Sequence, residues 1–134
     1  MRDDELEFLI EFREALRALV IQNTNAVKPD PTATVALREI ADSQPVRAVV
    51  SSEGAVSLMP AGDDVLARLL GLLLVVEDAQ RDGTWVHLKA CANEDCLWAF
   101  YDRSRNHGGT WCDMATCGNK LKNREFRARR RIAD

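Results

Sequence analysis

The N-terminal part of the chain spaces its apolar side chains as an amphipathic helix does. Residues 3–22 place them three and four positions apart, behind an acidic first turn that suits the N-terminal end of a helix dipole. Asp30 is a favourable N-cap and Pro31 fits a first helical position, so a shorter helix is predicted up to about Asp42. Pro45 then stops it. Both helices are expected to turn their apolar faces toward a core.

The next part of the chain predicts a β-hairpin followed by a long apolar helix. Two strand-like runs, residues 46–50 and 55–59, flank a turn of serine, glutamate and glycine. Residues 64–81 are apolar over much of a helix circumference, which is typical of a central core helix. Asp63 is its expected cap, and Gly83 fits the left-handed position after its end.

The C-terminal part predicts short elements and then a basic helix. Residues 85–89 predict a strand, residues 106–110 a turn-rich loop, and residues 119–131 a helix rich in lysine and arginine. Gly118 is expected to free the backbone where that helix starts. These elements predict an α+β fold that is mainly α: a small helical domain with a β-hairpin, followed by a module that ends in the basic helix.

Four cysteines stand in two pairs within this module. Cys91 and Cys96 form the first pair and Cys112 and Cys117 the second, and the chain has no other cysteine. Two close pairs are what a tetrahedral S4 zinc site needs, because each pair supplies two thiolates from one turn. We expect one structural Zn²⁺ per chain, since four thiolates leave no open position for catalysis. Disulfides or free thiols remain the alternative, and the sequence does not distinguish zinc from iron.

The side chains around the cysteines form a second pattern. An aromatic residue precedes Asp-x-Ser-x-Asn, then come Trp-Cys-x-Met and Cys-Gly-Asn, at Phe100, Asp102, Ser104, Asn106, Trp111, Cys112, Met114, Cys117, Gly118 and Asn119. This pattern closely resembles the CGNR zinc finger, a bacterial family named for Cys-Gly-Asn-Arg at its last ligand. The chain departs from the family at Asp113, usually serine, and at Lys120, where the namesake arginine would stand. Lysine keeps the charge but loses the planar fork of arginine.

The residues before the finger resemble a second domain of the same family. There the finger follows an α-helical domain called ABATE, which has an Arg-Glu-Ala-Leu-Arg-like helix, a hairpin and a long helix. Residues 13–17 and the predicted hairpin fit that order. The resemblance implies an ABATE-like domain at residues 1–85 and a CGNR-type finger at residues 86–134. The chain lacks the Phe-x-Asn-Thr strand that usually precedes this helix, so we expect one surface of the core to be exposed.

Charge is distributed unevenly along the chain. Residues 1–90 carry a net charge of −6 and residues 91–134 a net charge of +3, although the whole chain is at −3. Within residues 103–131, nine basic residues face only two acidic ones. Four thiolates around one divalent ion would subtract about two charges from the module. The positive charge is therefore concentrated in the arm after the cysteines, which indicates an anionic partner.

Residues typical of catalysis form no recognisable set. The sequence has no phosphate-binding glycine loop, nucleophile elbow or H-E-x-x-H motif. His87 is expected to be a packed or surface residue, and His107 is a minor candidate for a fifth zinc ligand beside a solvent or phosphate contact. Asp102 and Asp113 are expected to orient arginine or backbone N–H groups rather than to act as an acid–base pair. We therefore expect no enzyme.

DNA is the anionic partner that we expect. CGNR proteins are regarded as stress-linked bacterial regulators, so the resemblance implies a DNA-binding transcription regulator. The side chains expected to contact phosphates, with one or two reaching bases, are Arg103, Arg105, Lys120, Lys122, Arg124, Arg127, Arg129 and Arg130. The alternative is a zinc-stabilised protein-interaction or self-association module, possible as a homodimer, without DNA binding. A charged helix can also be simply a solvated surface.

Location follows from the same composition. No apolar run is long enough to span a membrane, and the charged start from Met1 to Glu5 does not resemble a secretory signal. We expect a cytoplasmic protein with no membrane partner, because that compartment keeps thiols reduced. No sequence pattern in residues 1–85 indicates an effector ligand.

Overall fold

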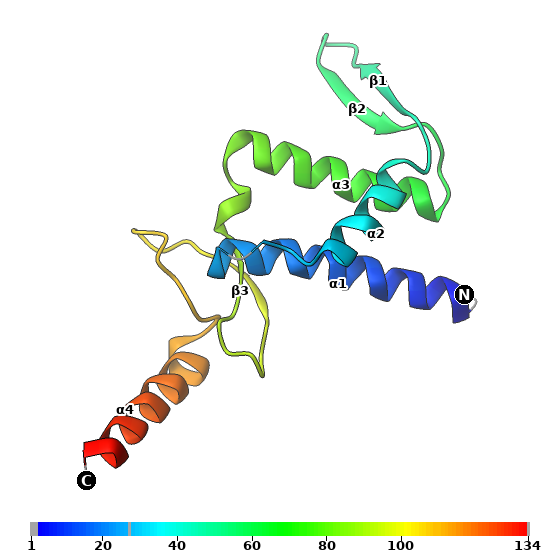
Figure 1. Ribbon diagram of the computed structural model, residues 1–134. Helices are drawn as coiled ribbons and strands as arrows, with labels where there is room; N and C mark the ends of the chain where they lie inside the picture. Colours follow the sequence, from blue (N-terminus) through cyan, green and yellow to red (C-terminus); the bar gives the residue numbers. More distant parts are fainter. Residues whose placement is uncertain (1–2, 27, 134) are drawn as a thin grey trace. The chain divides into compact units, whose positions relative to one another are not determined.

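The computed structural model describes residues 3–26 and 28–133 and has ten elements. Figure 1 shows them in order: α1 (Asp3–Asn25), α2 (Pro31–Ala41), β1 (Val46–Val50), β2 (Val56–Pro60), α3 (Val65–Asp82), the 3₁₀-helix η1 (Trp85–His87), β3 (Leu88–Ala90), β4 (Ala99–Tyr101), the π-helical turn η2 (Met114–Gly118) and α4 (Asn119–Ala133). The predicted fold class, α+β and mainly α with a β-hairpin and a C-terminal helix, is confirmed.

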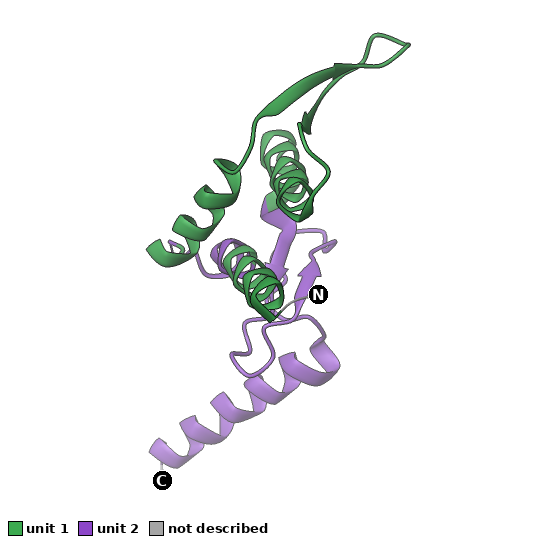
Figure 2. Cartoon of the chain, turned by 90° about the vertical axis from the view of Figure 1, so that its right-hand side faces the viewer, with its two compact units in different colours: residues 1–16, 29–85 green, residues 17–28, 86–134 purple. Residues whose placement is uncertain are grey.

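The chain forms two compact units, which Figure 2 colours separately. Unit 1 comprises residues 1–16 and 29–85, and unit 2 comprises residues 17–28 and 86–134. Helix α1 therefore contributes its N-terminal part to unit 1 and its C-terminal part to unit 2. The division into an ABATE-like domain and a finger remains a prediction, because compactness alone does not define a family domain.

Two expectations concern the membrane and the chain start. Among residues 3–26 and 28–133, no helix combines the length and the apolar character that crossing a membrane requires. The comparison of the chain start with a secretory signal rests partly on Met1 and Arg2, which lie outside the described residues.

Helix α2 begins as its sequence predicts. The Asp30 carboxylate accepts a hydrogen bond from the Thr32 N–H at 2.7 Å, and Pro31 occupies the first helical position, where its missing N–H has no cost. Leu37 and Ile40 face inward and are buried. The helix packs on α3 within unit 1.

The cap of α3 differs from the prediction. Asp64 is the N-cap rather than Asp63: its Oδ1 accepts the Ala67 N–H at 2.8 Å and the Gln44 Nε2–H at 3.2 Å. These hydrogen bonds hold the pKa of Asp64 below its usual value, with the backbone bond from Ala67 as the largest cause. At the other end Gly83 has φ of 85°, the predicted left-handed conformation.

Burial along α3 is one-sided. Ala67, Leu69 and Leu70 are buried, whereas Leu72 is 49% exposed and Val75 is 64% exposed. The helix is therefore a core helix on one face only, and the expectation drawn from its apolar circumference is wrong for the outer face. This outer face lies in unit 1, as does the β-hairpin.

The hairpin itself forms as predicted, one residue later in its second strand. β1 and β2 pair antiparallel with Val46 opposite Pro60, Arg47 opposite Met59, Ala48 opposite Leu58, Val49 opposite Ser57 and Val50 opposite Val56. In the turn, Ser51 Oγ accepts backbone N–H bonds from Glu53 and Ala55, and Gly54 has φ of 83°. β2 is the strand that packs against α3.

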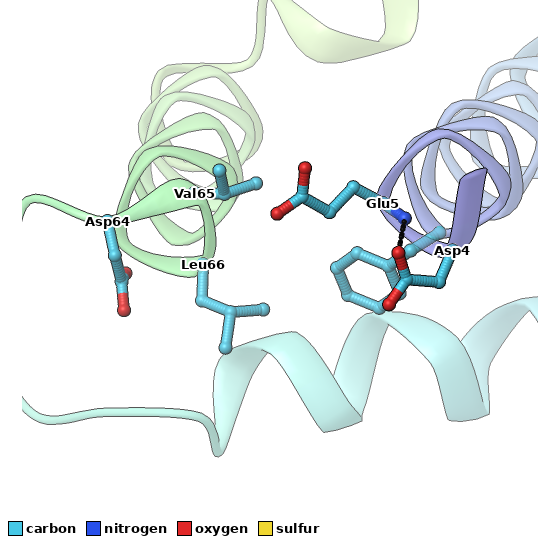
Figure 3. A pocket seen from close by; sticks show the side chains of 6 residues that line it. Asp4, Glu5, Asp64, Val65 and Leu66 are labelled. Atoms are coloured by element: carbon cyan, nitrogen blue, oxygen red, sulfur yellow. Dashed lines mark hydrogen bonds between the residues drawn. The ribbon is translucent and has the colours of Figure 1, made fainter. Parts of the chain in front are cut away.

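A hollow of about 480 Å³ opens in unit 1 between the first turns of α1 and α3 (Figure 3). Its lining is acidic and apolar: Asp4, Glu5, Phe8, Asp64, Val65 and Leu66. Figure 3 shows the Glu5 side chain pointing toward α3, and the Glu5 N–H donating to Asp4 Oδ1 at 3.1 Å. The Asp64 carboxylate caps α3, and Asp4 and Glu5 belong to the acidic first turn of α1. The acidic character of the lining therefore follows from the starts of these two helices.

Unit 2 holds the second sheet. Here Leu88 lies opposite Tyr101, Lys89 opposite Phe100 and Ala90 opposite Ala99. The strand predicted at residues 85–89 is wrong in its first part, because the chain makes the 3₁₀-helix η1 before β3 starts.

The end of α1 explains why this helix is longer than predicted. Asn23 donates to the Leu88 carbonyl at 2.8 Å, and Thr24 Oγ1 both donates to the Ala90 carbonyl and accepts the Ala90 N–H. These side chains satisfy the backbone groups on the free edge of β3, so the last turn of α1 is stabilised by tertiary contacts that the local sequence does not encode.

We predict that Asp64→Ala lowers the Tm by a few degrees, because the first turn of α3 loses its side-chain acceptor. Asp63→Ala is the matched control: the same change at the neighbouring position should leave the Tm nearly unchanged. Thermal unfolding followed by circular dichroism measures both. Equal effects of the two variants would contradict the assignment of the cap.

Candidate metal centre

The four cysteine sulfurs form one cluster in unit 2. All four Sγ atoms of Cys91, Cys96, Cys112 and Cys117 lie within 4.8 Å of one another. Cys96 Sγ is 3.7 Å from Cys112 Sγ, and Cys112 Sγ is 3.8 Å from Cys117 Sγ. Four sulfurs at about 2.3 Å from a tetrahedral zinc would lie about 3.8 Å apart. The distances are too long for disulfides, whose sulfurs are about 2.05 Å apart, and all four cysteines are free.

The first pair is shaped by Asn93. Asn93 accepts the Asp95 N–H on its side-chain oxygen at 3.1 Å and the Cys96 N–H on its carbonyl at 2.8 Å, which closes the turn. Its amide Nδ2 lies 3.6 Å from Cys117 Sγ and donates to it. One side chain therefore folds the first cysteine pair and contacts a ligand of the second pair. Sequence reasoning missed Asn93; asparagine two residues after a ligand is the signal that could have indicated it.

The second pair is shaped by Asp113 and Gly118. The Asp113 carboxylate accepts the Ala115 N–H at 2.7 Å and caps η2, as its predicted role of orienting backbone N–H groups requires. A Cβ on Gly118 would lie 2.6 Å from Met114 Sδ and 3.3 Å from the Trp111 ring. The glycine thus allows close packing of Met114 and Trp111 against the backbone, and α4 starts directly after it.

The donor set fits a divalent cation. Burial, followed by the neighbouring thiols, raises the pKa of Cys112 to about 12, while the hydrogen bond from Asn93 is the largest cause that lowers the pKa of Cys117 to about 7. Four clustered thiols, of which Cys91 and Cys117 are buried, cannot all ionise side by side without a cation between them. A soft divalent ion such as Zn²⁺ would supply that charge, and the four thiolates would fill its coordination sphere. Its role at this site is structural.

Unit 2 also contains a buried ion pair that was not predicted. Lys89 on β3 and Asp102 after β4 are both buried, with Lys89 Nζ 2.8 Å from Asp102 Oδ2. The ammonium also donates to the carbonyls of His107 at 2.6 Å and Gly109 at 3.0 Å, so its three protons are all used. Asp102 was expected to orient arginine or backbone N–H groups; it accepts the backbone N–H groups of Ser104 and Gly109 as expected, and its cation is a lysine, Lys89. A lysine inside an apolar strand is the signal that could have indicated it.

The other partners of Asp102 are the residues of its own loop. Its carboxylate accepts the Ser104 N–H, the Ser104 hydroxyl and the Gly109 N–H at 2.6–3.0 Å. A Cβ at Gly109 would lie 2.9 Å from that carboxylate, so only glycine fits. The bond from Lys89, and then the bonds from Ser104, hold the pKa of Asp102 well below its usual range. The pair thus fixes the whole loop that leads to Cys112.

The two histidines lie together, away from the sulfurs. Their rings stack at 3.8 Å between centroids, with Tyr101 edge-on to His87 at 6.0 Å. His107 Nδ1 lies 3.3 Å from the Asp102 carbonyl. Within the described residues, the metal-binding cluster contains only cysteines. His107, the minor candidate for a fifth ligand, is therefore not part of the cluster, and His87, expected to be a packed or surface residue, is half-buried.

The predicted DNA-contacting residues fall into two groups. Arg103 and Arg105 lie in the exposed loop after β4, and the Arg103 guanidinium is 5.9 Å from the centre of the Tyr101 ring. The other six lie on α4: Lys120, Lys122, Arg124, Arg127, Arg129 and Arg130. Lys122 Nζ lies 5.8 Å from the Trp111 ring, whose buried Nε1–H has no hydrogen-bond acceptor among the described residues.

Unit 2 is thus a zinc-finger module of the four-cysteine type: two cysteine turns, a small sheet and a helix that follows the last ligand. Residues 87–130 match the family model of the CGNR zinc finger, which covers the ion pair, the four cysteines and most of α4. This finding supports zinc as the metal of the site. No curated protein matched the chain.

We predict one zinc per chain, with four thiols appearing on chelation. For Asn93→Ala we predict a zinc affinity about 10- to 100-fold lower, which is the range typical of residues that contact metal ligands. The variant loses the N–H that stabilises the Cys117 thiolate. Competition with a chromophoric chelator measures the affinity, and Asn106→Ala in the exposed loop is the control. Unchanged affinity in Asn93→Ala would remove this role.

We predict that Asp102→Asn lowers the free energy of unfolding by about 3 kcal/mol, because it leaves Lys89 buried without its counter-ion. The folded-state pKa of Asp102 is depressed, so this stabilisation is present above the ordinary carboxyl pKa of about 3.9 and is lost as pH falls below it. Denaturant unfolding of zinc-loaded protein between about pH 5 and 8 measures the difference. Asp95→Asn, at an exposed carboxylate of the same module, should change little.

Proposed function

We propose that the chain is a DNA-binding transcription regulator in which zinc folds the module and α4 contacts the phosphate backbone. The observation that carries the proposal is the surface of α4. Not one residue of this helix is buried, and its cations, Lys120, Lys122, Arg124, Arg127, Arg129, Arg130 and Arg131, accompany a single acidic residue, Glu125. Leu121 is half-buried and the other residues of α4 are exposed, so packing stabilises this helix little and its composition reflects a role in solvent or with a partner.

The cations of α4 are largely available. Among the described residues, the only ion pair that α4 makes is Arg124 with Asp95, at 4.0 Å between two exposed side chains, and such a pair contributes little. Arg129 Nε donates to the Glu125 carbonyl at 3.4 Å along the helix. Phosphate oxygens would therefore not need to displace strong internal partners of these side chains.

The connection to the zinc site supports the same proposal. Cys117 is the last ligand, Gly118 is packed against Met114, and α4 begins at Asn119. A metal that fixes Cys117 therefore fixes the first turn of the basic helix. Pre-ordering the helix lowers the conformational entropy that a nucleic acid complex would otherwise cost. The loop with Arg103 and Arg105 is likewise held by the Lys89–Asp102 pair.

The proposal also covers the N-terminal domain, the location and the expected absence of catalysis. Residues 1–85 would be an ABATE-like domain, an interpretation supported by the order of α1, the hairpin and α3. The location would be cytoplasmic, where thiols stay reduced for zinc. The protein would not be an enzyme, since four thiolates close the metal to substrate. The competing function, an interaction module without DNA binding, predicts no affinity for duplex DNA.

We predict that affinity for duplex DNA falls about a thousandfold or more between about 50 and 200 mM salt, as expected for about six or more phosphate contacts. Replacing Arg127, Arg129 and Arg130 together by alanine should lower the salt slope by about one for each lost contact. Fluorescence anisotropy with a labelled duplex of mixed sequence measures both quantities.

The matched control replaces three exposed arginines of unit 1 that lie outside the β-hairpin, Arg13, Arg38 and Arg68, by alanine. It removes the same charge from the chain and should leave the slope unchanged. Both triple variants should retain one zinc per chain. Binding that does not depend on salt, or an α4 variant that binds as the wild type does, would contradict the proposal.

A further inference from the structure

The hairpin of unit 1 has a free strand edge. The ladder is bounded by hydrogen bonds from Ala61 N–H to the Pro45 carbonyl and from Ser51 N–H to the Ala55 carbonyl. In an antiparallel pair the bonded positions alternate, so Arg47 and Val49 bond to β2 while the N–H and C=O groups of Val46, Ala48 and Val50 point outward. The described residues place no third strand beside β1. Figure 1 shows β1 on the side of the hairpin away from α3.

The side chains at this edge are apolar and exposed. Val46 is 40% exposed, Val50 is 65% exposed, and Ala48 between them is exposed as well. Their cross-strand neighbours on the same face are Pro60, Leu58 and Val56. An apolar face of six residues therefore borders an unpaired backbone edge. Natural sheets protect such edges with charges, bulges or proline, and β1 carries only Arg47, on the opposite face.

We propose that β1 pairs with β1 of a second copy of this chain, antiparallel about a two-fold axis at Ala48, to give a four-stranded sheet. In this register Val46 lies opposite Val50 of the second copy, and Ala48 lies opposite its own equivalent. The three outward residues of each strand are then the hydrogen-bonded positions, so their N–H and C=O groups are satisfied in both copies. The interface is isologous, which is the commonest symmetry of soluble dimers.

Two features select this register among those that the edge allows. All three outward residues of β1 pair with one another only when the axis is at Ala48, and like charges disfavour the register centred on Arg47. Centring the axis on Arg47 would place two guanidinium groups directly opposite each other, which is unfavourable. With the axis at Ala48, Arg47 lies opposite Val49 of the second copy, and the two arginines are diagonal neighbours and not directly opposed. The apolar faces of the two hairpins also become continuous. A strand of unrelated sequence would avoid Arg47 and continue the apolar face only by chance, whereas a second copy does both by symmetry.

The test uses the fact that residue 48 meets itself. Sedimentation velocity of the zinc-loaded full chain across a concentration series should show a monomer–dimer equilibrium. Ala48→Lys and Ala48→Glu, each alone, should raise the dimer dissociation constant about tenfold or more, because like charges then face each other. An equimolar mixture of the two variants should dimerise at least as tightly as the wild type. Ser52→Lys, which adds the same charge in the exposed turn, should dimerise like the wild type.

Each other outcome would overturn the pairing. A wild type that stays monomeric to high concentration removes the dimer, and a dimer insensitive to both variants removes this edge. Loss in both variants without recovery in the mixture removes the register, provided that helicity and zinc content are unchanged. The inference does not rest on DNA binding, so the salt experiment and this experiment can fail independently.

Discussion

The mutual repulsion of four clustered thiolates, two of them buried, is the constraint on which unit 2 depends. Its buried side chains include few large apolar groups: Val20 is the largest, and the rest include Lys89, Cys91, Asp102 and Cys117. Such a set buries little apolar surface for a small module, so we expect metal binding to supply much of its stability. A divalent cation turns the repulsion into attraction and joins two turns that are far apart in sequence. Folding and metal binding of this unit are therefore one equilibrium.

The Lys89–Asp102 pair determines the path of the chain between the two cysteine pairs of the same module. The chain between the cysteine pairs must return to the site without a helix or a long strand to guide it. The pair fastens the strand before the first ligand to the loop before the third, and Ala92 N–H then bonds the Thr110 carbonyl at 2.9 Å. Because both charges are almost completely desolvated and saturated with hydrogen bonds, the loop has one low-energy arrangement. The metal joins the ligands, and the ion pair sets the path between them.

Local chemistry explains which features the sequence could predict. The cysteine spacing, the Asp30 cap and the left-handed Gly83 depend on a few neighbouring residues, and all three were predicted. The role of Lys89 depends on carbonyls of His107 and Gly109, far along the chain, and no local pattern reveals them. The long α1 likewise depends on Thr24 meeting β3. For α3, apolar composition did not distinguish burial in the core from exposure beside an unpaired hairpin, because both need the same residue types.

The chain therefore leaves two kinds of unsatisfied chemistry at its surface. On α4 it is positive charge whose one ion pair among the described residues, Arg124 with Asp95, is exposed and weak, so that an anion can bind there. On β1 it is unpaired backbone N–H and C=O groups beside apolar side chains, and another strand can satisfy both. A nucleic acid cannot satisfy the second requirement and a β-strand cannot satisfy the first, so the two surfaces do not compete for one partner. If both are used, each dimer carries two basic helices, and linked binding sites raise the effective affinity for DNA without any new contact between protein and bases.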